Sequence, residues 1–226
     1  MSRKVIDIFN RYAEYYDDWY KQPLGQYVVA VESMALFRLI PKEGRGVELG
    51  CGTGVFAKEV YRIDNIKDIL CLDPAYNMLK RARMRGLDSV CSVIKYAPFR
   101  NEIFDFVFMV TVVEFLDQPL DDLISIRSFL KKNGWLIIMF INRDSSWGKF
   151  YIDLAKKGEP ILSLAKIYSF DEIKTLLEKA GFVIHDIVGV LDFAPTDNPP
   201  LKPYIVTDRV DRCGAIFVKA QMLPIE

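Results

Sequence analysis

Histidine and cysteine are scarce in this chain. One histidine and four cysteines occur among 226 residues, and no two cysteines have the C-x-x-C spacing. A structural zinc site needs clustered thiolates and imidazoles, so neither such a site nor a thioredoxin-like pair is expected. We interpret the cysteines as reduced thiols of the core, with a Cys71–Cys91 disulfide as the alternative, and His185 as a structural histidine.

The chain also lacks an excess of charge of either sign. Its 30 Lys and Arg side chains balance its 30 Asp and Glu side chains. Nucleic-acid binding depends on a basic surface that neutralises phosphates, so no nucleic-acid partner is expected.

No hydrophobic run is long enough to span a membrane, which takes about 20 residues. The longest nearly apolar stretch, 106–116, is interrupted by Thr111 and Glu114. Residues 1–20 carry charges every few positions and lack the apolar core of a secretory signal. We therefore expect a cytoplasmic protein.

No internal repeat and no Gly/Ser linker divides the chain, and its length suits a single domain over 1–226. Residues 1–41 have apolar groups at helical spacing, interrupted around 23–25. We predict two helices that form an N-terminal cap.

From residue 46 onward, short apolar runs alternate with amphipathic segments of helix length. The runs 106–110 and 135–141 lack polar alternation, which is typical of parallel strands covered by helices on both faces. The predicted fold class is therefore α/β. The predicted strands are 47–49, 69–72, 90–94, 104–110, 135–141, 183–191 and 215–218.

Two predicted helices have recognisable end signals. Asp117 is a candidate N-cap for a helix that ends before Gly134. Ser169 and Glu172 have the spacing of a capping box, and Gly181 is placed to end that second helix.

The most informative segment follows the first predicted strand and precedes a helix that starts near Val55. It contains glycines at 50, 52 and 54. Glycine allows a sharp turn and close approach of a ligand to the backbone, and the following helix offers free N–H groups. The dinucleotide fingerprint requires its third small residue at position 55, so pyrophosphate binding is disfavoured.

Asp73 ends the second predicted strand. A carboxylate at this place can accept hydrogen bonds from both ribose hydroxyls. Together with the glycine turn, it predicts a ligand that carries adenosine.

At these positions the chain resembles the class I S-adenosylmethionine-dependent methyltransferases, in the group that includes the ubiquinone and menaquinone biosynthetic enzymes. Residues 48–54 resemble the family's E/D-x-G-x-G-x-G turn, and 73–79 resemble its ribose-binding acid and helix entry. Blocks over 98–105, 113–116, 127–134 and 176–182 resemble later family segments in the same order. The resemblance covers about residues 16–182.

The resemblance implies a Rossmann-like, seven-stranded, mostly parallel sheet with helices on both faces. Its C-terminal antiparallel hairpin would be formed by 183–191 and 215–218. S-adenosylmethionine is the implied cofactor, with S-adenosylhomocysteine as its product, over the carboxyl ends of the first, second and fourth strands.

The resemblance also implies contacts of single residues with the cofactor. Glu48 would face the methionine amino group, Gly50 and Gly52 would lie beneath methionine and ribose, and Asp73 would bind the ribose hydroxyls. Further implied contacts are Tyr16, Pro74, Met78, the backbone of Ile94 and the carbonyl of Thr111. One departure is Val93, because many relatives carry there an Asp that accepts from the adenine amine.

We therefore expect a methyltransferase that acts on a small-molecule acceptor. Methyl transfer from a sulfonium is an in-line displacement, so positioning can suffice, and Glu114 is only a weak acid or base candidate. Insertions 143–168 and 192–212 are expected to line the acceptor pocket together with the cap. A non-catalytic cofactor-binding regulatory module is the alternative, and a nicotinamide-dependent reductase is disfavoured. The sequence carries no signal for the methylated atom or the oligomeric state.

Overall fold

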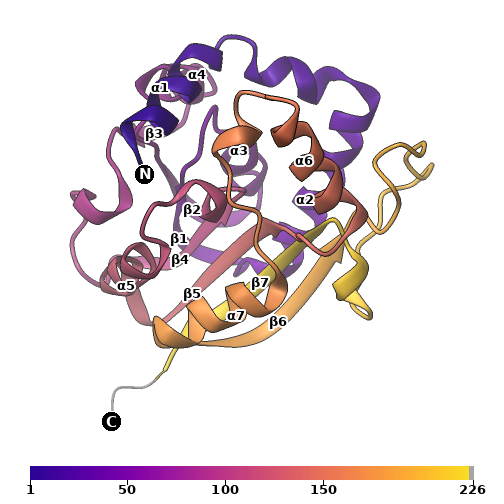
Figure 1. The fold of residues 1–226 in the computed structure, drawn as a ribbon. Helices are drawn as coiled ribbons and strands as arrows, with labels where there is room; N and C mark the ends of the chain where they lie inside the picture. Colours follow the sequence, from indigo (N-terminus) through magenta and orange to yellow (C-terminus); the bar gives the residue numbers. More distant parts are fainter. Residues whose placement is uncertain (224–226) are drawn as a thin grey trace.

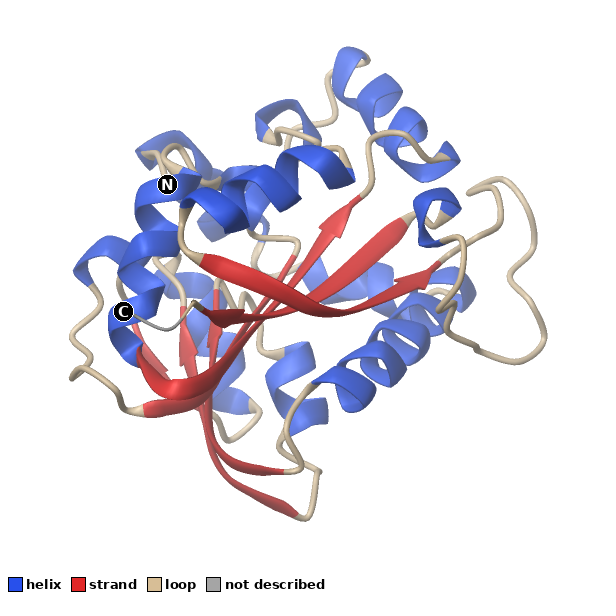
Figure 2. Ribbon diagram, turned by 90° about the horizontal axis from the view of Figure 1, so that it is seen from below, coloured by secondary structure: helices blue, strands red, loops and turns tan. Residues whose placement is uncertain are grey.

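Seven strands form one sheet between two layers of helices in the computed structural model, which describes residues 1–223 apart from the side chains of Asn65 and Lys67 (Figures 1 and 2). The strands are β1 (Glu43–Leu49), β2 (Asn65–Leu72), β3 (Asp88–Val90), β4 (Phe104–Val110), β5 (Leu130–Ile141), β6 (Phe182–Val190) and β7 (Ala215–Met222). The α-helices are α1 (Arg3–Tyr12), α2 (Pro23–Leu39), α3 (Val55–Val60), α4 (Tyr76–Met84), α5 (Pro119–Phe129), α6 (Ser146–Lys156) and α7 (Phe170–Lys179). Among the short 3-10 helices are η1 (Tyr16–Lys21), η2 (Ile94–Tyr96) and η3 (Val113–Phe115).

The strand order is β3-β2-β1-β4-β5-β7-β6. Strands β1 to β5 pair in parallel, whereas β7 pairs antiparallel with both β5 and β6. This arrangement confirms the expected α/β fold and its C-terminal hairpin. The chain leaves β1 toward β2 on one side and later returns to β4 on the other, so a crevice opens at the carboxyl ends of β1 and β4.

Strand β4 shows why its sequence lacks polar alternation. Phe106 and Phe108 are fully buried in the core cluster that includes residues of α2 and α3. Val107 and Met109 are equally buried in the opposite cluster, which includes residues of α5 and α7. Because helices cover both faces of the sheet, both faces of this strand must be apolar.

The N-terminal segment contains the two predicted helices, with η1 between them. The sequence predicted an interruption between the two helices at 23–25, but Pro23 is the first residue of α2. Proline is favourable at the first position of a helix. Gly25 is required there, since a Cβ atom would lie 2.1 Å from the carbonyl oxygen of Trp19.

Two predictions of local structure are wrong. Strand β3 ends at Val90, and η2 follows, because this edge strand pairs with β2 over only three residues. Asp117 does not cap α5, which begins at Pro119 and ends at Phe129. Its carboxylate instead pairs with the Met1 ammonium at 3.1 Å. The capping box of α7 is confirmed, with both reciprocal hydrogen bonds present.

All four cysteines are free thiols. Cys51, Cys71 and Cys213 are buried as predicted, but Cys91 is exposed beside the edge strand β3. His185 is also exposed, and its ring packs edge-on against Trp135 with centroids 5.1 Å apart.

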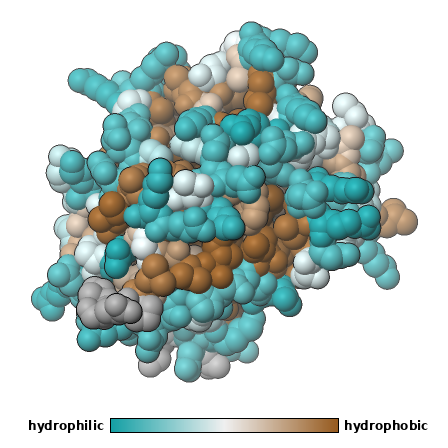
Figure 3. All heavy atoms as spheres, turned by 60° about the horizontal axis from the view of Figure 1, so that its bottom comes forward, coloured by the Kyte–Doolittle hydropathy of each residue, from teal (hydrophilic) through white to brown (hydrophobic). Residues whose placement is uncertain are grey.

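The surface carries mixed polar and apolar groups. Figure 3 shows a stripe of hydrophobic side chains across a face that is otherwise mainly hydrophilic. Within residues 1–223, no helix has the length and apolar character needed to cross a membrane.

Candidate functional site

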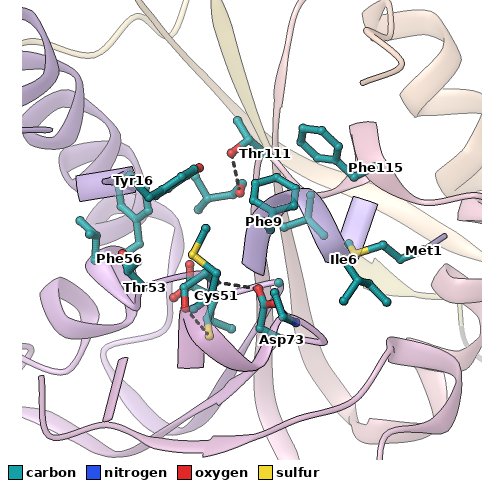
Figure 4. A pocket seen from close by; sticks show the side chains of 18 of the residues that line it. Met1, Ile6, Phe9, Tyr16, Cys51, Thr53, Phe56, Asp73, Thr111 and Phe115 are labelled. Atoms are coloured by element: carbon teal, nitrogen blue, oxygen red, sulfur yellow. Dashed lines mark hydrogen bonds between the residues drawn. The ribbon is translucent and has the colours of Figure 1, made fainter. Parts of the chain in front are cut away.

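A cavity that is partly open to solvent lies at the carboxyl ends of β1, β2 and β4 (Figure 4). The empty space in this region, open solvent included, is about 620 Å³. Its floor is the glycine turn between β1 and α3, and its roof comes from α1, η1 and η3. Seven of the nine residues predicted to contact the cofactor line it, namely Tyr16, Glu48, Gly50, Gly52, Asp73, Met78 and Thr111. Their contacts with a cofactor stay predictions.

The three glycines of the turn have positive φ angles of 67°, 54° and 78°, but only one of them faces open space. A Cβ atom on Gly50 would lie 2.6 Å from Val112, and one on Gly54 would lie 2.6 Å from Leu87. A Cβ atom on Gly52 would meet nothing within 4 Å. Gly50 and Gly54 are therefore needed for packing, whereas Gly52 leaves bare backbone that a ligand can approach.

Asp73 connects the end of β2 to the glycine turn. Its Oδ2 accepts a hydrogen bond of 2.8 Å from the Gly52 backbone nitrogen, and its Oδ1 accepts one of 2.7 Å from Ala75. The carboxylate is 8% exposed, and burial raises its pKa to about 6 although both backbone bonds act against that shift. Each oxygen keeps a lone pair for a further donor.

Glu48 joins β1 to the first turn of α3. Its Oε2 accepts a hydrogen bond of 2.8 Å from the Ala57 nitrogen, one of the N–H groups that have no partner within the helix. Burial raises the pKa of Glu48 to about 8, and the nearby Asp73 adds to the shift. Glu48 thus also stabilises the N-terminus of α3, which the sequence did not indicate.

Thr111 follows β4 in a left-handed conformation with φ of 51°, which is unusual for a β-branched residue. Its hydroxyl donates a hydrogen bond of 2.8 Å to the carbonyl of Val110. Backbone strain of this kind persists only where the surrounding structure enforces it, and here it lies at the edge of the cavity.

Aromatic rings close the cavity from above. Phe9 of α1 packs edge-on against both Tyr16 and Phe115, with ring centroids 6.1 Å and 5.1 Å apart. Tyr16 packs in turn against Tyr20, whose ring lies 6.0 Å away. We call these four side chains the aromatic roof.

Asp17 attaches this roof to the floor. Its Oδ1 accepts a hydrogen bond of 2.6 Å from the Thr53 hydroxyl within the glycine turn. Its Oδ2 accepts one of 2.9 Å from Arg85 and lies 3.5 Å from the Arg81 guanidinium. The sequence placed Asp17 only next to Tyr16 and did not identify its partners, which lie far along the chain.

The other two predicted residues, Pro74 and Ile94, line a smaller adjoining cavity, where the empty space, open solvent included, is about 270 Å³. Gly50 and Val112 border both cavities. Val93, where an acidic residue is common among relatives, also lines the smaller cavity.

A carboxylate that sequence reasoning missed reaches this smaller cavity. Asp122 of α5 lines it, is 7% exposed, and has a pKa raised mainly by burial. The sequence did not indicate this residue as part of the site, because its helix is separated from the glycine turn by more than 60 positions.

Glu114 lines neither of these two cavities. Its Oε1 accepts a hydrogen bond of 2.8 Å from the Ile141 nitrogen, which links η3 to the end of β5. Its Oε2 is buried and has no partner among the described residues. Burial raises the pKa of this carboxyl to about 7.

The arrangement supplies acids for hydroxyl or ammonium groups, apolar walls for a flat ring, and exposed backbone at the turn. The acidic, partly open cavity and the glycine that faces it thus fit a nucleoside with an amino-acid tail, the kind of ligand expected from the sequence.

Comparison with known proteins points the same way. A family model described as a methyltransferase domain matches residues 25–187. An uncharacterised protein of Methanocaldococcus jannaschii is 36% identical over 78% of this chain and 82% of its own length. A ubiquinone biosynthesis O-methyltransferase of Xanthomonas axonopodis is 26% identical, over 68% of this chain and 69% of that protein.

A solved structure from Thermotoga maritima has the same fold with a TM-score of 0.85. It is 29% identical, and the alignment covers 96% of this chain and 99% of that one. That protein is described as a SAM-dependent methyltransferase and "possible histamine N-methyltransferase".

Proposed function

Because the chain belongs to the class I S-adenosylmethionine-dependent methyltransferases, we propose that it transfers a methyl group to a small-molecule acceptor. The observation that carries this proposal is the open space above Gly52, next to the carboxylate of Asp73. Bare backbone and a buried acid with free lone pairs are what a ribose diol needs.

We assign the other predicted residues to different parts of the cofactor. We assign the methionine amino group to Glu48 and to the carbonyl of Thr111, and the ribose hydroxyls to Asp73. Met78 and the aromatic roof would cover the nucleoside, since their apolar surfaces face the cavity. Pro74 and Ile94 would hold the adenine ring in the smaller cavity.

Asp122 is our candidate acceptor for the exocyclic amine of adenine. It lies in the same small cavity as Val93, so a carboxylate from α5 would replace the one that relatives carry at position 93. The unfavourable burial of an acid at this place is then offset by a hydrogen bond to the ligand.

When bound, the cofactor supplies an electrophilic methyl group on a sulfonium. The protein's task is to hold the acceptor in line with that group and to exclude water. Positioning of this kind contributes up to roughly 7 to 11 kcal/mol. Phe9, Tyr16 and Phe115 cover part of the cavity and thereby limit the access of solvent to it.

We further propose that 1–226 is a single methyltransferase domain that acts in the cytoplasm. Residues 1–41 would form its cap, and insertions 143–168 and 192–212 would contribute to the acceptor pocket. In support, Trp147 donates a hydrogen bond of 2.7 Å to the carbonyl of Phe193, which joins the two insertions.

Calorimetry with S-adenosylmethionine, S-adenosylhomocysteine and NAD tests the cofactor, and a methylation assay over a metabolite panel tests the activity. We expect both adenosyl ligands to bind and NAD not to bind. Binding without methyl transfer to any acceptor would favour the alternative, a regulatory module. Binding of NAD alone would overturn the proposal.

A further inference from the structure

A cluster of buried acids lies next to the cofactor cavity. Glu32 of α2 and Glu114 of η3 are 5% and 3% exposed. Burial, and after it the nearby Glu114, raise the pKa of Glu32 to about 8, so the two carboxyl groups lie close together. Helix α2 and the end of β4 therefore bring together two acids that lie 82 positions apart.

These acids have no positive partner. Within residues 1–223, no salt bridge involves Glu32, Glu48 or Glu114. The Oε2 atom of Glu114 also has no hydrogen-bond partner among the described residues. Burying carboxyl groups with no cation nearby, and with one oxygen of Glu114 left without a donor, is costly, so this arrangement calls for a ligand that supplies a positively charged donor.

Three tyrosines lie near Glu32. Tyr16 and Tyr20 of η1 and Tyr151 of α6 all have pKa values raised by burial and by the field of Glu32. Their aromatic faces suit an organic cation. Tyr16 and Tyr20 also line the cofactor cavity, so Glu32 lies next to one side of that cavity.

The position of the cluster relates it to the transferred methyl group. Glu114 follows Thr111 by three residues, and Thr111 lines the cofactor cavity at the place assigned above to the methionine end. A molecule held by Glu114 would thus lie near the reactive end of the cofactor and away from the adenine, which belongs to the cavity around Pro74.

We propose that the methyl acceptor is an organic amine, that Glu32 and Glu114 bind its ammonium group beside Tyr16, Tyr20 and Tyr151, and that its nitrogen receives the methyl group. This inference rests on the function proposed above and names its substrate class. An anionic acceptor would add negative charge to the buried acids, and a neutral alcohol would donate a hydrogen bond but supply no positive charge.

The chemistry balances without a further reactant. The bound ammonium gives one proton to a glutamate carboxylate and becomes a neutral amine. The nitrogen lone pair then forms the N–C bond while the C–S bond breaks, and its electron pair stays on sulfur. The products are a methylated ammonium ion, the neutral thioether S-adenosylhomocysteine and a protonated glutamate, which releases its proton to solvent.

Binding in the presence of S-adenosylhomocysteine tests the proposal. The probes are matched sets of small amines, alcohols and carboxylates with the same aromatic or alkyl skeleton, for example 2-phenylethylamine with 2-phenylethanol and 3-phenylpropionate. We expect amines alone to raise the melting temperature. We expect Glu32→Gln and Glu114→Gln each to weaken amine binding at least tenfold while S-adenosylmethionine affinity stays unchanged.

Glutamine suits both positions because it keeps the shape, and at position 114 it keeps an acceptor for the Ile141 nitrogen. Glu178→Gln, on the exposed face of α7, is the matched control and should bind amines like the parent protein. Mass spectrometry of the product should place the methyl group on nitrogen.

Proton release provides a readout that a structural effect on folding would not reproduce. Glu32 faces Glu114, Tyr16, Tyr20 and Tyr151, and the neighbouring Glu48 also acts on Tyr20. At pH 6 the two central glutamates are mainly protonated, so binding of a cation should release about one proton into the buffer. Calorimetry in buffers of different ionisation enthalpy measures this number.

Each result decides one question. If the cofactor does not bind, the proposed function itself fails. If the cofactor binds but no amine does, if carboxylates or alcohols bind better, or if both glutamine variants keep full amine affinity, only the amine proposal is overturned.

Discussion

The hydroxyl of Thr53 donates a hydrogen bond of 2.6 Å to Asp17, although 36 positions separate the two residues. Both side chains are buried, and Arg85 shares the same carboxylate. The bond attaches the N-terminal segment to the glycine turn, so the roof of the cavity is held in place before a ligand binds.

Replacing Asp17 should therefore loosen the roof. In Asp17→Asn, the charged partner of Arg85 is lost, and we expect cofactor affinity to fall about tenfold, or about 1.4 kcal/mol. Hydrogen exchange should rise over residues 3–21. Asp18→Asn is the matched control, since the neighbouring Asp18 is exposed and pairs with the exposed Lys21. Equal effects of the two variants would remove this function from Asp17.

Asp73→Ala should weaken cofactor binding by about 1.5 to 3 kcal/mol, the range for hydrogen bonds to a charged group. The variant should also melt earlier, because the backbone nitrogens of Gly52 and Ala75 lose their acceptor. Calorimetry measures the affinity, and Asp88→Ala, an exposed acid on β3, serves as the control. Unchanged binding in Asp73→Ala would falsify its assignment to the ribose.

Two glycines allow the effect of backbone strain on stability to be distinguished from the effect of a lost ligand contact on affinity. Gly52 and Gly86 both have positive φ angles, of 54° and 79°, and both have open space where a Cβ atom would be. Alanine at either position should cost about 1 kcal/mol of stability. Of these two variants, only Gly52→Ala should also reduce cofactor affinity, because Gly52 lines the cavity and Gly86 does not. A comparable loss of affinity in Gly86→Ala would show that the effect is transmitted through stability.

Adenine recognition can be tested at Asp122. We expect Asp122→Leu to weaken S-adenosylhomocysteine binding by about 1 to 2 kcal/mol, since the exocyclic amine loses its acceptor. The inosine analogue, which lacks this amine, should bind the variant and the parent protein alike. Asp121→Leu changes the exposed neighbour and should leave both affinities as they are. If the variant discriminated between the two bases as well as the parent does, Asp122 would not be the acceptor.

Stability should fall as the pH rises. Burial raises the pKa of Glu32 and Glu48 to about 8 and that of Glu114 to about 7, from an ordinary value of 4.5. The folded state then binds more protons than the unfolded chain between about pH 4.5 and 8, so the free energy of unfolding decreases across this interval. Melting temperatures of the ligand-free protein from pH 5 to 8.5 measure the slope.

The double variant Glu32→Gln, Glu114→Gln should have a flatter profile, because glutamine does not titrate. Asp73, with a pKa raised to about 6, adds to the slope near that pH in both proteins. A stability that rises between pH 6 and 8 would contradict the burial of these acids without a cation.

Short-range signals predicted much of the architecture. The capping box of Ser169 and Glu172, the glycine turn and the apolar run of β4 each depend on neighbours in the chain, and all three occur as expected. The prediction failed at 90–94, where an apolar run forms no continuous strand. Ile94 lies in the 3-10 helix η2, and its side chain is buried in the core. An apolar side chain can thus be buried without belonging to a strand.

The amino-acid sequence alone determined the α/β class, the turn with its bare backbone at Gly52, and the acid at the end of β2, because these depend on local conformation and strand periodicity. The tertiary structure decided which distant groups meet: Asp17 with Thr53, Asp122 with the small cavity, and Glu32 with Glu114. These long-range contacts depend on how the crossover connections place α2, α5 and η1 around the sheet. No local pattern encodes them, since each pair is formed only when the whole core packs.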